Sequence, residues 1–280
     1  MSSALVADTS LPYHARGMTL PAVDTDYDLE LFISGPFLPD LTYLFARIGN
    51  ATVDAVGEAA PGRVLDVGSG ASQELSRLAR QGWAAYAVEP SRHMLAFARA
   101  TNEEMGTAVH LVRAIGERLP FADASLDAVT SQCALDHFGD RHAFMREAAR
   151  VVKPAGRVVI ALHNFDGLAC RLGRLLHPIA KASRLHHCAE WTCWQIPPDH
   201  TFKGNWPLVR ELGLPWLRLE RAHGISLLTN FYGWGHLLHR LPDGLAQRLL
   251  RLADRAAYSR PVLSDVIVSV WSPAPEFDAS

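Results

Sequence analysis

The stretch "VLDVGSGASQ", residues 64–73, decides the fold of this 280-residue chain. Its apolar start predicts a short strand, and its glycines predict a tight turn that leads into a helix. A turn of this kind at the carboxyl end of a parallel strand is typical of a site for a nucleotide-like cofactor. The stretch therefore predicts a cofactor site, in which Ser72 stands where another glycine would be expected.

Strands and helices are expected to alternate around this turn. The predicted strands are 63–67, 84–88, 108–112, 126–132 and 156–163, and the predicted helices are 38–59, 72–81, 91–105 and 140–152. Further along the chain, 216–224 and 262–271 have the pattern of strands and 236–258 that of a helix, whereas 165–215 has no long regular period. Alternation of this kind indicates βαβ units. We predict an α/β fold with a seven-stranded, mostly parallel, doubly wound sheet, helices on both faces, and a helical or irregular substrate lid.

These elements suggest a division of the chain into five parts. The parts are an N-terminal tail and cap helix (1–60), a cofactor-binding core (61–163), lid insertions that contain one strand (164–260), a final core strand (261–272) and a tail (273–280).

Composition excludes several classes of function. The net charge of −2 gives no electrostatic reason to expect nucleic acid or an anionic membrane as the main partner. No apolar run is long enough to span a membrane, so no membrane insertion is expected. The four cysteines do not suggest a disulfide framework, and the first residues do not resemble a signal peptide, so a cytoplasmic location is expected.

Charges beside the glycine turn narrow the choice of cofactor. A dinucleotide fingerprint G-x-G-x-x-G would need a glycine at Gln73, so that match is incomplete. Asp66 would oppose a pyrophosphate but suits a cationic ligand. Glu89 closes the next strand, where an acid can accept hydrogen bonds from ribose hydroxyls. A ligand with a ribose, positive charge and no phosphate fits these features, and S-adenosylmethionine is such a ligand.

Four ordered blocks carry a resemblance to a known family. The blocks are "VLDVGSGASQ", "AAYAVEPSRHMLAFARA", "ERLPFADASLDAVTSQCALDHFGD" and "FMREAARVVKPAGRVVIA". Together they resemble the cofactor half of the class I S-adenosylmethionine-dependent methyltransferases. The resemblance covers about residues 50–163.

The resemblance implies which residues hold the cofactor. They are Asp66, Gly68, Ser69 and Gly70 in the turn, Glu89, Pro90 and Met94 after the second strand, Ile115, Gly116 and Glu117 near the adenine, and Ser131 and Gln132 after the fourth strand. Two positions depart from the family pattern. Ser72 replaces a glycine but is expected to cap the following helix. Ile115 replaces an acid that often holds the adenine amine, at a cost of about 0.5–1.5 kcal/mol.

The chemistry is expected just beyond the fourth strand. His137 is the candidate base, with Asp136 as a second candidate, although a histidine here can equally be a packing residue. The later part of the chain is expected to bind the acceptor, and its candidate residues are His163, Trp191, Trp194, His200 and Tyr232. Asp199 and Lys203 can reach the same pocket or simply fasten their loop to the sheet.

The predicted reaction is methyl transfer to a small, apolar or aromatic acceptor, such as a secondary metabolite, a quinone or a lipid-linked molecule. The alternative is a methyltransferase-like protein that binds the cofactor but performs other chemistry or regulation, and a nicotinamide-dependent oxidoreductase is a weaker third. No metal is expected, because the cysteines and histidines of 186–193 match no standard zinc spacing. The helix expected at 236–258 has a basic face that is either solvated or set against a membrane surface.

Overall fold

The computed structural model describes residues 38–182, 194–196 and 200–275. Its centre is a seven-stranded sheet in the order β3-β2-β1-β4-β5-β7-β6. The strands are β1 (Arg63–Val67), β2 (Ala84–Val88), β3 (Val109–Val112), β4 (Leu126–Gln132), β5 (Val152–His163), β6 (Leu217–Ile225) and β7 (Val266–Pro273). The first five strands are mutually parallel, and β7 runs antiparallel to both of its neighbours. The predicted mostly parallel, seven-stranded α/β fold is therefore confirmed.

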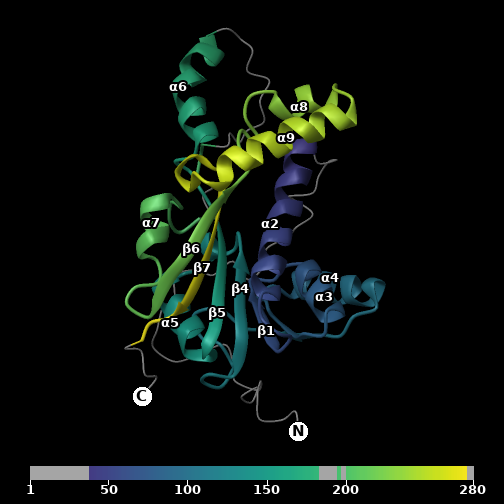
Figure 1. Cartoon of the computed structure of the whole chain (residues 1–280), viewed down its shortest axis with the longest axis vertical. Coiled ribbons are helices and arrows are strands. Elements are labelled where there is room, and N and C mark those ends of the chain that lie inside the picture. Colours follow the sequence, from purple (N-terminus) through teal and green to yellow (C-terminus); the bar gives the residue numbers. More distant parts are fainter. Residues whose placement is uncertain (1–37, 183–193, 197–199, 276–280) are drawn as a thin grey trace.

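Helices cover both faces of this sheet (Figure 1). Their bounds are α2 (Pro39–Gly57), α3 (Gln73–Arg80), α4 (Arg92–Met105), α5 (Arg141–Val151), α6 (Leu168–Ala182), α7 (Trp206–Glu211), α8 (Trp234–His239) and α9 (Asp243–Tyr258), with short 3-10 helices η1 (Leu135–His137) and η2 (Pro261–Leu263). Helices α2 and α3 bury apolar side chains such as Leu44 and Leu75 against one face. Helices α5 and α7 bury Phe144 and Val209 against the other.

Strand order determines where a ligand can bind. Strand β1 lies between β2 and β4 in the sheet. The order of the strands therefore reverses at β1, with β2 and β3 on one side and β4 and β5 on the other. Ligands of open α/β sheets bind outside the carboxyl ends of the strands at such a point. The turn after β1 therefore lies beside the ends of β2 and β4, and β5 ends next to β4.

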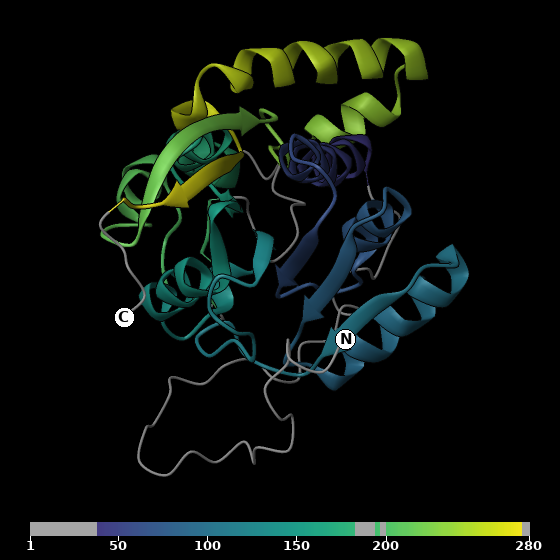
Figure 2. The same cartoon turned by 60° about the horizontal axis from the view of Figure 1, so that its bottom comes forward.

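The structure corrects the predictions for the second half of the chain. Residues 165–215, in which the sequence shows no long regular period, contain α6 and α7, and α6 was not predicted because it continues through Pro178. The single helix expected at 236–258 is two helices, α8 and α9, because Pro242 cannot extend the first one. The final strand begins at Val266, since 261–263 forms a 3-10 turn. In Figure 2, α9 runs along one side of the molecule above the ends of β6 and β7.

Within the described residues, no helix combines the length and the apolar character needed to cross a membrane.

Candidate functional site

The turn after β1 makes a close approach to the end of β4. Gly68 has φ +69° and donates its N–H to the carbonyl of Val88, at 2.8 Å. A Cβ atom at Gly68 would lie 2.5 Å from the Cβ of Ala134, so this position requires glycine both for its conformation and for space. Gly70 also has a positive φ, and a Cβ there would lie 3.4 Å from the end of Met94. Bare backbone thus forms the floor of the predicted cofactor site.

Ser72 does not cap α3 through its side chain, contrary to the sequence-based expectation. Its φ of 57° is left-handed, and its hydroxyl is buried and makes no hydrogen bond within the described residues. The left-handed conformation points the side chain away from the N–H groups at the start of the helix. The backbone N–H of Ser72 instead closes the turn by donating to the carbonyl of Ser69, at 2.9 Å.

Replacing Ser72 with glycine should therefore stabilise the fold. A residue with a Cβ pays about 1–2 kcal/mol in the left-handed region, and the greater freedom of glycine in the unfolded chain offsets part of this gain. We expect the free energy of unfolding to rise by about 0.5–1 kcal/mol and Tm by about 1–4 °C. Thermal and denaturant unfolding of Ser72→Gly measure this change. Ser91→Gly is the matched control, because Ser91 has φ −73° and caps α4, so this variant should lose stability. A less stable Ser72→Gly protein would contradict the strain argument.

Glu89, at the end of β2, organises the backbone around the turn. One carboxylate oxygen accepts the N–H of Gly70 at 3.2 Å, and the other accepts the N–H of Ser91 at 2.9 Å. The Ser91 hydroxyl in turn accepts the N–H of Met94, which confirms Ser91 as the cap of α4. Glu89 is 6% exposed. A carboxylate is thus fixed beside the glycine turn, where the sequence predicts contact with a ribose.

Several acidic groups gather under the turn. Asp66 is 3% exposed and accepts a hydrogen bond of 2.6 Å from Thr130 on β4. Burial raises the pKa of Asp66 to about 7, and the charges of Glu74 and Glu89 add to the rise. Burial also raises the pKa of Glu74. No salt bridge engages Asp66 within the described part of the chain, so this end of the site has an electrostatic preference for a cationic ligand.

The remaining residues predicted to bind cofactor lie around the same edge. A Cβ at Gly116 would lie 2.6 Å from the ring of Phe138, so the 115–117 segment packs tightly on the residue that follows η1. Glu117 accepts the N–H of Gly139 at 2.7 Å and thereby fastens the segment after η1. Ser131 is fully buried at the end of β4. Ser69, Pro90, Ile115 and Gln132 lie at the same strand ends, and their contacts with a cofactor stay a prediction.

A second polar cluster lies at the adjoining ends of β4 and β5. Asp136 is 1% exposed, and its carboxylate lies 3.1 Å from Nδ1 of His200 and 3.7 Å from Nδ1 of His163. The rings of His137 and His200 meet edge to face, with centroids 4.8 Å apart. Three of the predicted acceptor or catalytic histidines are therefore brought together by Asp136, although they come from three separate segments.

Thr201 places His200 in this cluster. Its N–H and hydroxyl donate to the carbonyl of Asp136, at 2.7 and 3.1 Å, and the hydroxyl also reaches the carbonyl of Phe138. The same loop is fastened to the end of β5 by Lys203, which pairs with Asp166 at 2.6 Å. Lys203 thus fastens the loop, while Asp199 lies outside the described residues. His200 is held over η1 by backbone geometry that its sequence position does not reveal.

Charge is unevenly distributed within the cluster. Burial would raise the pKa of Asp136, but the hydrogen-bonding and charged partners His163, His200 and His137 together lower it to about 2. Burial opposes the charged form of His163, yet the neighbouring Cys133 and Asp136 hold the pKa of this histidine well above its usual value. The structure thus places an ionised carboxylate among imidazoles beside the predicted cofactor site.

The predicted aromatic acceptor residues form a separate group. Trp194 lies with its ring centroid 5.1 Å from that of Tyr232, and the Tyr232 hydroxyl lies 3.1 Å from Nδ1 of His177 on α6. The structure therefore brings Trp194 and Tyr232 together. Trp191 and the Cys/His segment 186–193 lie outside the described residues.

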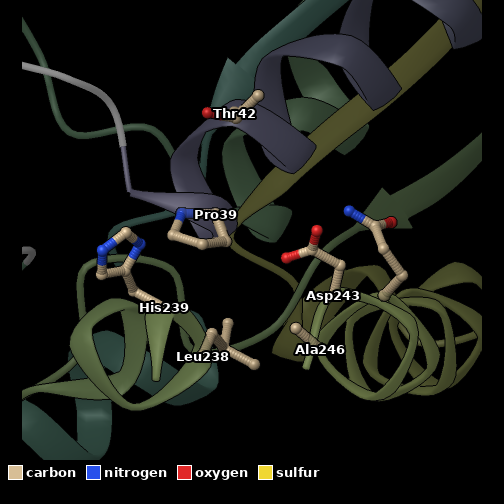
Figure 3. Close-up of a pocket in the computed structure, with 7 residues that line it drawn as sticks. Pro39, Thr42, Leu238, His239, Asp243 and Ala246 are labelled. Atoms are coloured by element: carbon tan, nitrogen blue, oxygen red, sulfur yellow. The ribbon is translucent and has the colours of Figure 1, made fainter. Parts of the chain in front are cut away.

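The cavity drawn in Figure 3 is not this site. Its volume is about 350 Å³, and it lies between the start of α2 and helices α8 and α9. Its walls include Pro39, Leu238 and Asp243, and none of the residues predicted to bind cofactor or acceptor lines it.

Sequence reasoning missed several members of the site. Thr130 pairs with Asp66 because the two residues are partners in the β1–β4 register. Strand spacing could have revealed Thr130, since it lies one residue before the predicted Ser131. Glu74 and Phe138 contribute through tertiary contacts that no local pattern signals.

Comparison with known proteins identifies the fold family. Residues 65–160 match a family described as "Methyltransferase domain". Residues 65–160 are thus a methyltransferase domain, and the chain has the fold of its class I methyltransferase neighbours. This finding confirms the resemblance carried by the four sequence blocks.

Individual relatives agree with this assignment. The chain is 39% identical to a demethylmenaquinone methyltransferase of Corynebacterium kroppenstedtii over 35% of its own length and 40% of that protein. It is 33% identical to the uncharacterized methyltransferase YcgJ of Bacillus subtilis over 52% of its length and 61% of that protein. The solved YcgJ structure superposes with a TM-score of 0.53 at 17% identity, covering 83% of this chain and 100% of YcgJ. A geranyl diphosphate methyltransferase complexed with GPP and sinefungin superposes with a TM-score of 0.53 at 14% identity, covering 81% of this chain and 77% of that one.

Proposed function

We propose that this protein is an enzyme that binds S-adenosylmethionine at the turn after β1 and transfers its methyl group to a small organic acceptor held at the ends of β4 and β5. The observation that carries the proposal is the direct adjacency of two unlike sites. An acidic, glycine-floored cradle at Gly68 touches the β4 end at Ala134, and the Asp136 cluster begins two residues later. Methyl transfer needs such an arrangement of donor and acceptor sites.

The cradle fits the proposed cofactor. S-adenosylmethionine supplies a methyl group on a positively charged sulfur, together with an ammonium and a ribose. Asp66 and Glu74 have carboxyl pKa values raised by burial, so a cation bound beside them would relieve an unfavourable concentration of acids. Glu89 offers carboxylate oxygens for ribose hydroxyls, and Gly68 and Gly70 leave the backbone open to close approach. Gly116 and Met94 would border the adenine.

The acceptor end supplies orientation and proton handling. Methyl transfer from an activated donor needs mainly alignment and exclusion of water. An acceptor hydroxyl or acidic carbon also has to lose a proton. His137 lies beside the ionised Asp136 and is the group that we propose to receive this proton, with Asp136 fixing the imidazoles around it.

The acceptor is proposed to be apolar or aromatic, a quinone or a lipid-linked molecule being suitable examples. The adjacent aromatic rings of Trp194 and Tyr232 support this choice, since aromatic side chains that line a site favour planar or hydrophobic ligands. The name of the Corynebacterium relative, a demethylmenaquinone methyltransferase, agrees with it. Because the chain spans only 40% of that protein's length, the substrate of the relative is not transferred as such. We propose that the lid formed by 164–260 encloses this acceptor.

Turnover with a labelled methyl donor tests the proposed reaction. The protein is incubated with methyl-labelled S-adenosylmethionine and a panel of quinols, phenols and isoprenoid lipids, and the products are separated by solvent extraction. Label is expected in at least one apolar acceptor. If the protein binds the donor but labels no acceptor of any class, the alternative of a cofactor-binding protein with other chemistry or a regulatory role replaces methyl transfer.

Cofactor affinity should depend on pH through Asp66. The raised pKa of about 7 means that the free protein holds this carboxyl mostly protonated at pH 6. A cationic ligand favours the ionised form, so binding expels a proton and becomes tighter as pH rises. We expect S-adenosylmethionine to bind about tenfold more tightly at pH 8 than at pH 6, as a group of this pKa dictates. Calorimetric titration at several pH values measures the effect. Asp66→Asn, which cannot ionise, should bind with a flatter pH profile, and an equal slope in both proteins would contradict the linkage.

A further inference from the structure

We infer that Asp136, His137 and His200 form a binding site for one divalent transition-metal ion, which contacts the acceptor. One donor atom from each of these residues lies within 4.8 Å of the others. Donors that share an ion at about 2.1 Å lie roughly 3–4 Å apart, so a shift of about 1 Å would close the set around an ion. Two imidazoles and one carboxylate form a familiar set of three ligands that leaves coordination positions open.

Burial of Asp136 supports a ligand at this position. Its side chain is 1% exposed, and neither carboxylate oxygen accepts a hydrogen bond of normal geometry from any described residue. Nδ1 of His200 lies 3.1 Å from this carboxylate, which is close enough for a shared ion or for an ion pair. A buried carboxylate without hydrogen bonds is costly unless another charge compensates it. The neighbouring imidazoles supply part of that compensation, and a metal ion bound between them and the carboxylate would supply more.

The surrounding chain fixes the ligand set. Asp136 and His137 are neighbours in η1, and Thr201 clamps the following loop onto the carbonyl of Asp136. His163 lies 3.7 Å from the same carboxylate and would serve as an outer partner that orients it. Backbone hydrogen bonds hold the segments that carry these ligands, so only the side chains have to shift when an ion enters.

The donor types select the ion. Imidazole ligands favour Zn²⁺, Co²⁺, Ni²⁺ or Fe²⁺ over Mg²⁺ or Ca²⁺, which prefer oxygen. With the ion bound, His137 would be a ligand and not the proton acceptor. In the open positions, the ion would bind a hydroxyl or enol oxygen of the acceptor and lower its pKa, and the proton would leave to solvent instead. This catalytic role rests on the proposed function, whereas binding of the ion does not.

Cobalt titration tests the site without reference to turnover. The full chain is prepared without a polyhistidine tag, stripped with a chelator and titrated with Co²⁺, whose visible absorption reports its coordination. Binding of one equivalent is expected. His200→Ala and His137→Ala should each weaken binding at least tenfold. The matched control is His236→Ala, which removes an exposed histidine of α8 and should bind as the unaltered protein does. Thermal unfolding confirms that each variant is folded.

Separate outcomes distinguish the two proposals. Failure to take up Co²⁺, or equal uptake by His200→Ala and His236→Ala, would overturn the metal site and leave methyl transfer intact if S-adenosylmethionine still binds. Stoichiometric Co²⁺ binding that depends on His200, in a protein that does not bind S-adenosylmethionine, would support the metal site and overturn the proposed function. Zn²⁺ competition for the cobalt signal should follow the same dependence on His200 and His137.

Discussion

Glu89→Ala is expected to weaken the binding of S-adenosylmethionine by about a hundredfold. The carboxylate has two proposed tasks: it holds the N–H groups of Gly70 and Ser91, and it accepts hydrogen bonds from the ribose. Hydrogen bonds to a charged group contribute about 1.5–3 kcal/mol each, so the loss of two to the ligand costs about 3 kcal/mol or more. That energy corresponds to about two powers of ten in Kd. Calorimetric titration measures the change directly.

Two further variants separate binding from folding in this test. Glu103→Ala removes an exposed acid from α4 and should bind the cofactor normally. Glu89→Gln keeps one acceptor oxygen and should give an intermediate affinity. Unchanged affinity of Glu89→Ala for S-adenosylmethionine would place the ribose elsewhere. Measurement of Tm shows whether Glu89→Ala is folded. If its Tm is much lower, the titration is made with Glu89→Gln instead.

His137→Ala should slow turnover by about a hundredfold or more while Kd for S-adenosylmethionine changes less than about twofold. The reason is the separation of roles between the two ends of the site. His137 lies with Asp136 and His200 at the proposed acceptor end, whereas Asp66 and Glu89 belong to the proposed cofactor cradle. Steady-state kinetics with the acceptor found in the labelling screen, together with calorimetry, measures both quantities.

His142→Ala provides the matched comparison for this prediction. His142 is an exposed histidine of α5, five positions further along the chain, and should turn over normally. If His137→Ala and His142→Ala turn over equally fast, His137 is a packing residue, which is the alternative that its sequence position leaves open. A loss of cofactor binding in His137→Ala would show that the two ends of the site are not independent.

The first half of the fold was predictable because local pattern and tertiary structure agree there. The strands at 63–67 and 84–88 are short, mostly apolar runs, and Ser91 both signals and makes the cap of α4. The second half was harder because its signals conflict with its structure. Pro178 lies inside α6, where a proline normally ends a helix, and the leucines from 236 onward continue across Pro242 although the helix does not.

The cofactor cradle was predictable for a related reason. Asp66, Gly68 and Glu89 lie at the ends of adjacent strands, so their spacing in the sequence fixes their proximity. Ser72 shows the limit of such reasoning, since residue type suggested a cap and backbone conformation prevented it. The acceptor cluster depends on contacts over a long range: His200 joins Asp136 only because Thr201 binds the η1 backbone.

Parallel calorimetric titration of the purified protein with S-adenosylmethionine, S-adenosylhomocysteine and NADH tests the central claim most directly. The acidic cradle, the close approach at Gly68 and the carboxylate of Glu89 predict micromolar binding of both sulfur compounds and no binding of NADH, whose pyrophosphate would meet Asp66. Absence of binding by either sulfur compound would contradict the account. The chain would then keep the methyltransferase fold without its cofactor site.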